Sequence, residues 1–248
     1  MSLEIDRKRF IFKTKQIWFA DYPYDIKGFD RVVFRDCKNK VNIPGFSRRE
    51  YTTLVIDLTQ DLDTIWRNMS SGNCRKPIRR AERAGIKIKM NQNYNEFYTL
   101  YNSVRAMKKL SGSINSKDIR RYATLFIAEF NGEIVSGHGY LEDKNNMRSW
   151  VIGSKRFEAA EKDITMVANA SKLIIWEAIK YAKAKGIKEF DFGGYYAGGE
   201  GKEILNTPNW FKQSFGGKVI THYIYQKDYS KIYTFARSLY QLARRVLK

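Results

Sequence analysis

The feature that most constrains the fold is a β-hairpin near the middle of the chain. Residues 125–130 and 133–141 are rich in apolar and β-branched side chains, and Asn131-Gly132 between them is a dipeptide that closes a tight two-residue turn. A further strand pattern follows over 147–152. These three segments predict an antiparallel sheet.

A long amphipathic pattern over 165–185 follows and ends at Gly186, which suits the left-handed residue that closes a helix. A short strand over 188–192 comes directly after it. The other expected elements are strands over 32–34, 51–58 and 218–226 and helices over 61–69, 77–85, 94–110, 116–122 and 229–247. This order predicts an α/β (α+β) fold with a mixed, mostly antiparallel central sheet flanked by helices.

Several classes of protein are excluded by what the sequence lacks. Two cysteines cannot form a disulfide framework, and two histidines offer no zinc-ligand spacing, so we expect no metal site. There is no dinucleotide-binding or phosphate-binding glycine loop and no Gly-x-Ser-x-Gly nucleophile motif. No apolar run approaches a membrane span and the N-terminus lacks the apolar core of a signal peptide, so we expect a cytoplasmic protein.

The net charge of +19, from 45 Lys and Arg against 26 Asp and Glu, is densest over residues 75–85. On a helix, Arg75, Arg79 and Arg83 would form one row and Arg80 would lie beside it. Such a face suits a polyanionic partner, either the phosphates of RNA or a nucleotide-linked substrate. The alternative interpretation is a solvated helix face.

Two Gly-Gly sequences near the end of the chain hold the other candidate residues. The candidates are Asp191, Gly193, Gly194, Tyr195, Trp210, Phe211 and Lys212. A lysine among aromatic side chains can stabilise a developing oxyanion, and paired glycines allow a ligand close to the backbone. The alternatives are that Asp191 caps a turn and that Lys212 extends from a packed aromatic cluster.

Four segments, taken in order, resemble the Fem family of peptidoglycan-bridge aminoacyltransferases. They are the basic segment 75–86, the hairpin 126–137, the helix and strand 168–194, and Phe211-Lys-Gln-Ser-Phe-Gly-Gly. The resemblance covers about residues 50–226. Members of this family add amino acids from aminoacyl-tRNA to peptidoglycan precursors and are built on the GNAT acyltransferase fold.

The resemblance implies roles for individual residues. Lys212 would stabilise the charge formed when an amine attacks an activated ester, and Phe211 would line the same channel. Arg75, Arg79 and Arg80 are the candidates for holding substrate phosphates, with Asp191, Gly193, Gly194, Tyr195 and Trp210 as further substrate-binding residues. His138, on the return strand of the hairpin with Ser136 and Tyr140, is a candidate base, with a structural histidine as the alternative.

Family members usually have two GNAT-like domains, whereas we expect one here, over residues 61–228, with 1–60 as an N-terminal extension or partial domain and 229–248 as a basic amphipathic helix. That helix would pack on its own domain or a partner, or lie peripherally on a membrane. The donor would be aminoacyl-tRNA, with no tightly bound cofactor. Residues 162–169 contain no glycine for a pyrophosphate-binding turn, which disfavours acyl-CoA.

Two alternative functions stay open at this stage. One is N-acylation of a sugar nucleotide with an acyl-CoA or carrier thioester. The other is a non-catalytic RNA-binding module.

Overall fold

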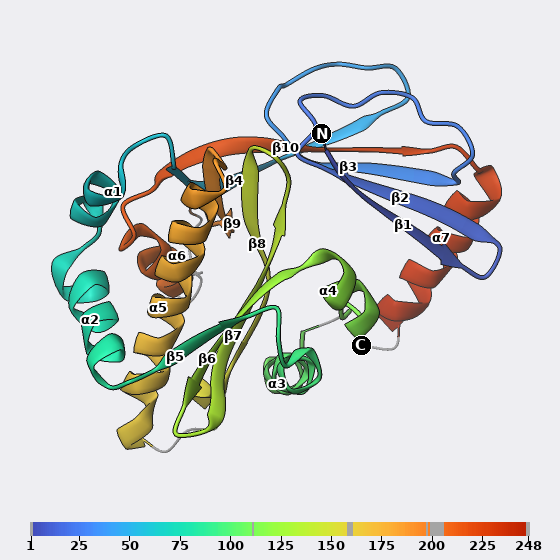
Figure 1. The fold of residues 1–248 in the computed structure, drawn as a ribbon. Coiled ribbons are helices and arrows are strands. Elements are labelled where there is room, and N and C mark those ends of the chain that lie inside the picture. Colours follow the sequence, from blue (N-terminus) through green and yellow to red (C-terminus); the bar gives the residue numbers. More distant parts are fainter. Residues whose placement is uncertain (1, 111, 158–160, 197, 199–205, 247–248) are drawn as a thin grey trace. The chain divides into compact units, whose positions relative to one another are not determined.

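The computed structural model describes residues 2–110, 112–157, 161–196, 198 and 206–246 (Figure 1). The chain forms two compact units. The central unit is Thr53–Ile220, and the terminal unit combines Met1–Thr52 with Thr221–Lys248. This division differs from the predicted one, because the C-terminal residues complete a sheet with the N-terminal strands and are not a separate appendage.

The central unit is built on the predicted hairpin. Its strands β5 to β9 are Lys87–Met90, Thr124–Phe130, Glu133–Glu142, Asn146–Ser154 and Glu189–Tyr195. They lie in the order β9-β8-β7-β6-β5, with antiparallel pairs except for the parallel β8 and β9. Asn131 and Gly132 both have positive φ, at 51° and 80°, as the predicted tight turn requires. The predicted mixed, mostly antiparallel sheet is therefore confirmed.

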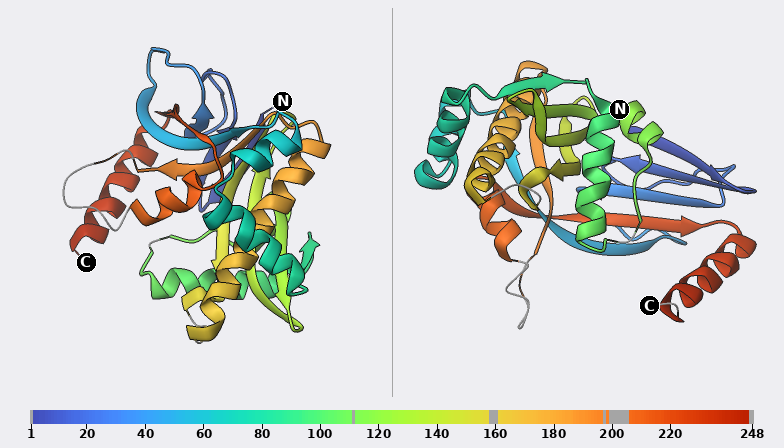
Figure 2. Two further views of the ribbon diagram at one scale, coloured as in Figure 1. Left: turned by 90° about the vertical axis from the view of Figure 1, so that its left-hand side faces the viewer. Right: turned by 90° about the horizontal axis from the view of Figure 1, so that it is seen from below.

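Helices cover both faces of this sheet, as Figure 2 shows for α3 and α5. The helices α1 to α6 are Leu62–Asn68, Lys76–Arg83, Tyr94–Met107, Ser116–Tyr122, Glu161–Ala184 and Asn206–Gln213. Side chains alternate along β6: Phe126 and Ala128 pack in the core of α5, whereas Leu125 and Ile127 pack in the core of α3 and α4. Two apolar cores thus hold the sheet in a fixed position between its helices.

Two strands run from one unit into the other. β4 (Ser47–Asp57) crosses the division after Thr52, and β10 (Lys218–Asp228) crosses it after Ile220. The division between the units therefore falls within two strands.

The terminal unit contains β1 (Leu3–Arg9), β2 (Phe12–Trp18), β3 (Arg31–Cys37), β10 and α7 (Lys231–Val246). β1 and β2 pair antiparallel, β2 and β3 parallel, and β3 and β10 antiparallel. β1 and β2 were not predicted, because their charged side chains hide the pattern, although Ile5 and Ile17 are fully buried. Among the described residues, the helices fall short of the length and hydropathy needed to cross a membrane.

A buried polar cluster shapes the pairing of β3 with β10. Asp36 has φ of 62°, and the register between the two strands shifts between Tyr223 and Tyr225. The Asp36 carboxylate accepts a hydrogen bond from the Tyr51 hydroxyl and lies 2.6 Å from Nδ1 of His222. These side chains satisfy the buried carboxylate at this β-bulge.

Candidate active site

The site lies where two parallel strands part. β8 and β9 pair only over Asn146–Arg148 and Glu189–Asp191, although β8 continues to Ser154 and β9 to Tyr195. Arg148 and Asp191 are the last pair of this register. The backbone groups of β9 beyond Asp191 are thereby released from pairing with β8, which leaves this part of the strand to interact with other groups.

Asp191 is a buried anion with three donors around it. Its carboxylate pairs with the Arg148 guanidinium, and their side chains are 5% and 11% exposed. It also accepts hydrogen bonds from the Thr53 hydroxyl and, at 2.6 Å, from the Gly193 amide. Gly193 has φ of 75°, which favours glycine there. Asp191 therefore fixes the path of the backbone at Gly193.

Lys212, on α6, reaches this same turn. Its ammonium donates hydrogen bonds to the Gly193 carbonyl at 3.2 Å and to the Gly194 carbonyl. Burial lowers the pKa of Lys212 from 10.5 to about 8; the nearby Asp191 charge opposes this shift and the Arg148 charge adds to it. An ammonium has three N–H donors. Two are bound to the turn, and among the described residues the third has no acceptor, so it can bind a substrate oxygen.

α6 is attached to β9 by side chains that flank Lys212. Asn209 accepts from the Tyr196 amide at 3.0 Å and donates to the Tyr196 carbonyl at 2.6 Å. Gln213 donates to the Tyr195 hydroxyl at 2.6 Å, so Tyr195 helps to hold this helix. Trp210 points outward and is 55% exposed, which leaves it available to a ligand.

The residues after Lys212 are held by close packing. The Phe211 and Phe215 rings meet edge to face with centroids 5.5 Å apart, and Phe215 is fully buried. A Cβ at Gly216 would lie 2.5 Å from the Asn68 carbonyl oxygen, and one at Gly217 would lie 2.3 Å from Leu54 Cδ2. The two glycines are therefore required for α6 to pack here. The sequence Phe-Lys-x-x-Phe-Gly-Gly fixes Lys212 by this packing.

The basic residues lie on a π-helix and on the α-helix that directly follows it. Ser71–Arg75 is a π-helix, in which the Arg75 amide bonds to the Ser70 carbonyl, so Arg75 precedes α2. Arg79 lies on α2 with its guanidinium carbon 5.6 Å from the centroid of the Trp66 ring, and Arg80 is exposed. Arg75 Nε is buried and bonds to no partner among the described residues.

A second cation, Lys172 of α5, lies in the same neighbourhood. Burial raises the pKa of Cys74 to about 12, and the charges of Lys172 and Arg75 and a hydrogen bond with Ser214 oppose this. Burial lowers the pKa of Lys172, and the charge of Arg156 lowers it further. Both cations and Ser214, two residues beyond Lys212, therefore act on the same buried thiol. Sequence reasoning missed Lys172 because it looks like any polar position on a long amphipathic helix.

His138 is part of the core between β7 and α5. It is 3% exposed, its Nδ1 lies 3.5 Å from the Tyr140 hydroxyl, and its Nε2 has no partner among the described residues. Burial lowers its pKa to about 3. The imidazole is therefore neutral at physiological pH and a very weak base, which favours the structural alternative over the predicted catalytic one.

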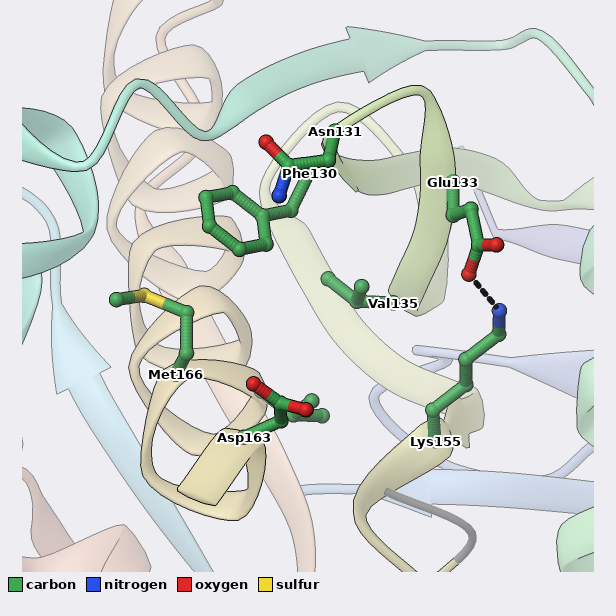
Figure 3. Close-up of a pocket in the computed structure, with 8 residues that line it drawn as sticks. Phe130, Asn131, Glu133, Val135, Lys155, Asp163 and Met166 are labelled. Carbon is green, nitrogen blue, oxygen red and sulfur yellow. Dashed lines mark hydrogen bonds and ion pairs between the residues drawn. The ribbon is translucent and has the colours of Figure 1, made fainter. Parts of the chain in front are cut away.

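A cavity of about 450 Å³ lies elsewhere in the central unit (Figure 3). It is lined by the β6–β7 turn, the start of α5 and Lys155, whose ammonium pairs with Glu133 at 2.8 Å. None of the predicted site residues lines it. The candidate site is defined by hydrogen bonds and strand parting, independently of this cavity.

One family model matches part of the chain. Residues 116–203, which run from α4 through β9, match the family model described as an acetyltransferase (GNAT) domain. No curated protein matches the sequence. The matched segment contains both Arg148 and Asp191, the pair at the point of strand parting.

Solved structures share the fold at low identity. FemX matches with a TM-score of 0.61 and 11% identity over 98% of this chain and 90% of its own. The C-terminal domain of a protein from Agrobacterium fabrum described as a lysylphosphatidylglycerol synthetase matches with a TM-score of 0.55, at 13% identity over 87% of this chain and 78% of its own. L-PGS from Bacillus licheniformis matches with a TM-score of 0.54, at 14% identity over 90% of this chain and 80% of its own. Residues 116–203 thus match the GNAT acetyltransferase family, and the chain as a whole shares the fold of FemX, which together support an acyltransferase.

Proposed function

We propose that the chain transfers an aminoacyl group from aminoacyl-tRNA to an amine of a cell-envelope precursor. The observation that carries the proposal is the Lys212 ammonium, held by two carbonyl groups beside the parted strands with one N–H left to donate. Resemblance to the Fem motifs and the shared fold with FemX support the aminoacyl donor. Such donors and nucleotide-linked acceptors place the reaction in the cytoplasm.

The proposed reaction requires electrostatic stabilisation of an oxyanion and no covalent nucleophile on the enzyme. The acceptor amine attacks the ester carbonyl carbon, the C–N bond forms, and the carbonyl electron pair moves to oxygen. Lys212 donates its remaining N–H to that oxyanion. When the C=O bond re-forms, the ester C–O bond breaks and the leaving hydroxyl takes up the proton that the amine loses, giving an amide and free tRNA. Removing one oxyanion donor lowers the rate by about 10²–10³-fold in other enzymes.

Lys212→Met tests this role. We expect transfer from aminoacyl-tRNA to fall by about 10²–10³-fold while tRNA binding persists, because the substitution removes a donor needed in the transition state. Lys218→Met, at an exposed lysine six residues further on, is the matched control and should keep the full rate. Full activity of Lys212→Met would reject the role. Salt-dependent tRNA binding with no product from the wild-type chain would favour an RNA-binding module instead.

Arg75 and Lys172 are proposed to hold a substrate phosphate. Both are partly buried cations near the end of α6, and neither pairs with an acid among the described residues. Arg75→Gln and Lys172→Gln should raise KM with little change in kcat, since a remote phosphate is bound equally in ground and transition states. Lys117→Gln, at an exposed position of α4, serves as the control. Equal KM values for all three variants would reject this role.

Acyl-CoA is the second candidate donor, because the matched family model is that of an acetyltransferase domain. The connection before α5 offers Lys155 and Arg156 as cations but no glycine through Asn169. Thermal-shift measurements with aminoacyl-tRNA, acyl-CoA and a nucleotide sugar separate the candidates, because a ligand stabilises the folded state that binds it. Stabilisation by acyl-CoA alone would move the assignment to N-acylation with a thioester donor.

A further inference from the structure

The terminal unit exposes a ridge of large apolar side chains on α7 and on the turn between β1 and β2. We call this set the apolar ridge: Phe10, Ile11, Ile232, Phe235, Leu239 and Leu242. Their exposed fractions are 83%, 77%, 71%, 66%, 51% and 59%. Single exposed apolar residues are ordinary, but four in one helical stripe and two in one turn of the same unit indicate an interaction surface.

The helix α7 contacts the sheet of the terminal unit through the face opposite its apolar stripe. The Tyr233 ring meets Phe12 of β2 edge to face at 5.2 Å, and Arg237 pairs with Asp228 at 2.9 Å. Residues 232, 235, 239 and 242 follow the spacing of a single helical stripe, away from these contacts. Figure 1 shows α7 beside the β1–β2 strands. The apolar stripe is therefore left outside, while an aromatic contact and an ion pair hold the helix.

Positive charge is concentrated in the terminal unit that carries this ridge. The terminal unit has 18 Lys and Arg against 8 Asp and Glu in 80 residues, a net charge of +10, whereas the central unit has 27 against 18 in 168 residues, a net charge of +9. Lys8 and Lys13 lie directly opposite each other in the β1–β2 register, two residues from the ridge on either side of the turn, and both are exposed. Like charges in that position repel unless an anion lies between or over them.

We propose that the apolar ridge inserts between the lipids of an anionic bilayer while the surrounding lysines and arginines bind the lipid headgroups. An amphipathic helix with flanking cations binds such a surface both by burying its apolar side chains and by electrostatic attraction to the anionic headgroups. A second copy of the chain is the less favoured occupant, because pairing two ridges would bring two units of +10 together. The proposal concerns the terminal unit and does not depend on the reaction assigned to Lys212.

The experiment is sedimentation of the full chain with vesicles of phosphatidylglycerol and, separately, of phosphatidylcholine. We expect binding to phosphatidylglycerol that weakens with salt, and little binding to phosphatidylcholine. Phe235→Ser with Leu239→Ser should weaken binding by about tenfold or more, since both side chains lose their apolar contact with the bilayer. Leu110→Ser, at a 51% exposed leucine in the central unit, is the matched control.

A second readout follows the ridge itself. In Phe235→Trp, the new indole emission should shift to the blue when phosphatidylglycerol vesicles are added, because the ring leaves water. Equal binding of wild type and the double serine variant to phosphatidylglycerol, or an unshifted emission with bound vesicles, would overturn the proposal. So would a wild-type dimer that binds no vesicles and that the double variant converts to a monomer, because the ridge would then be a dimer interface.

Discussion

Replacing Asp191 with Asn removes the carboxylate that the Arg148 guanidinium, the Thr53 hydroxyl and the Gly193 amide share. Breaking a buried ion pair from one side costs about 3–5 kcal/mol. The asparagine oxygen can still accept a hydrogen bond from Thr53 or Gly193, so we expect the free energy of unfolding to fall by about 3 kcal/mol, near the lower end of this range. For a chain of this size that corresponds to a fall in Tm of about 6–12 °C.

The same substitution acts on Lys212. The Asp191 charge raises the pKa of Lys212, against the effects of burial and of Arg148. Without that charge the pKa falls below about 8, so less ammonium is present at a given pH. We therefore expect the alkaline decline of the transfer rate to move to lower pH in Asp191→Asn. Calorimetry and a pH–rate profile measure the two effects separately.

A double variant serves as the control. Arg148→Met with Asp191→Leu removes both charges together, and apolar replacement of a buried pair is often neutral for stability. We expect it to recover most of the Tm lost in Asp191→Asn. An unchanged Tm together with an unchanged alkaline decline in Asp191→Asn would refute the argument that this carboxylate holds the turn and supports the charge of Lys212.

Three further outcomes are expected. The wild-type transfer rate should fall as pH rises through about 8, the pKa of Lys212. Lys212→Arg should keep its rate there, because the guanidinium stays protonated. A wild-type rate that rises through this range would make the neutral amine of Lys212 the active form. The wild type should lose up to about 5 kcal/mol of stability as pH falls from 6.5, the pKa of His138 in the unfolded chain, towards about 3, its pKa in the folded chain. The cause is that only the unfolded imidazole binds a proton in this pH range. Urea unfolding of His138→Phe should show a smaller loss over the same range. Gly216→Ala, with φ of 80° and a Cβ 2.5 Å from the Asn68 carbonyl oxygen, should cost about 1–3 kcal/mol, while Gly72→Ala, with nothing within 4 Å, should stay within about 0.5 kcal/mol in the same unfolding assay.

Local patterns predicted the central unit well. The hairpin at Asn131-Gly132 and the helix 116–122 have the expected bounds, because turn chemistry and a capping Asn115 act over a few residues. β5 and α6 were missed, since a strand of four residues and a helix of eight carry too little periodicity. The π-helix at Ser71–Arg75 was also missed, and with it the true position of Arg75.

The site could be predicted only in part. Lys212 and Asp191 stand out because unusual Gly-Gly sequences lie beside them. Arg148 and Thr53 did not, because a lone arginine and a lone threonine on β-strands give no local signal for a partner 43 or 138 residues away. The burial that lowers the pKa of Lys212 is likewise a property of the folded packing and has no counterpart in the sequence.

The division of the chain also sets the order in which the two units fold during synthesis. The central unit is one continuous segment, so it can fold once residue 220 has left the ribosome. The terminal unit has to wait, because β3 pairs with β10, and until then β3 exposes an open edge on which the strands of another nascent chain can pair. The last 28 residues therefore complete a sheet that was begun by the first 52, and a chain truncated before them would leave that edge open.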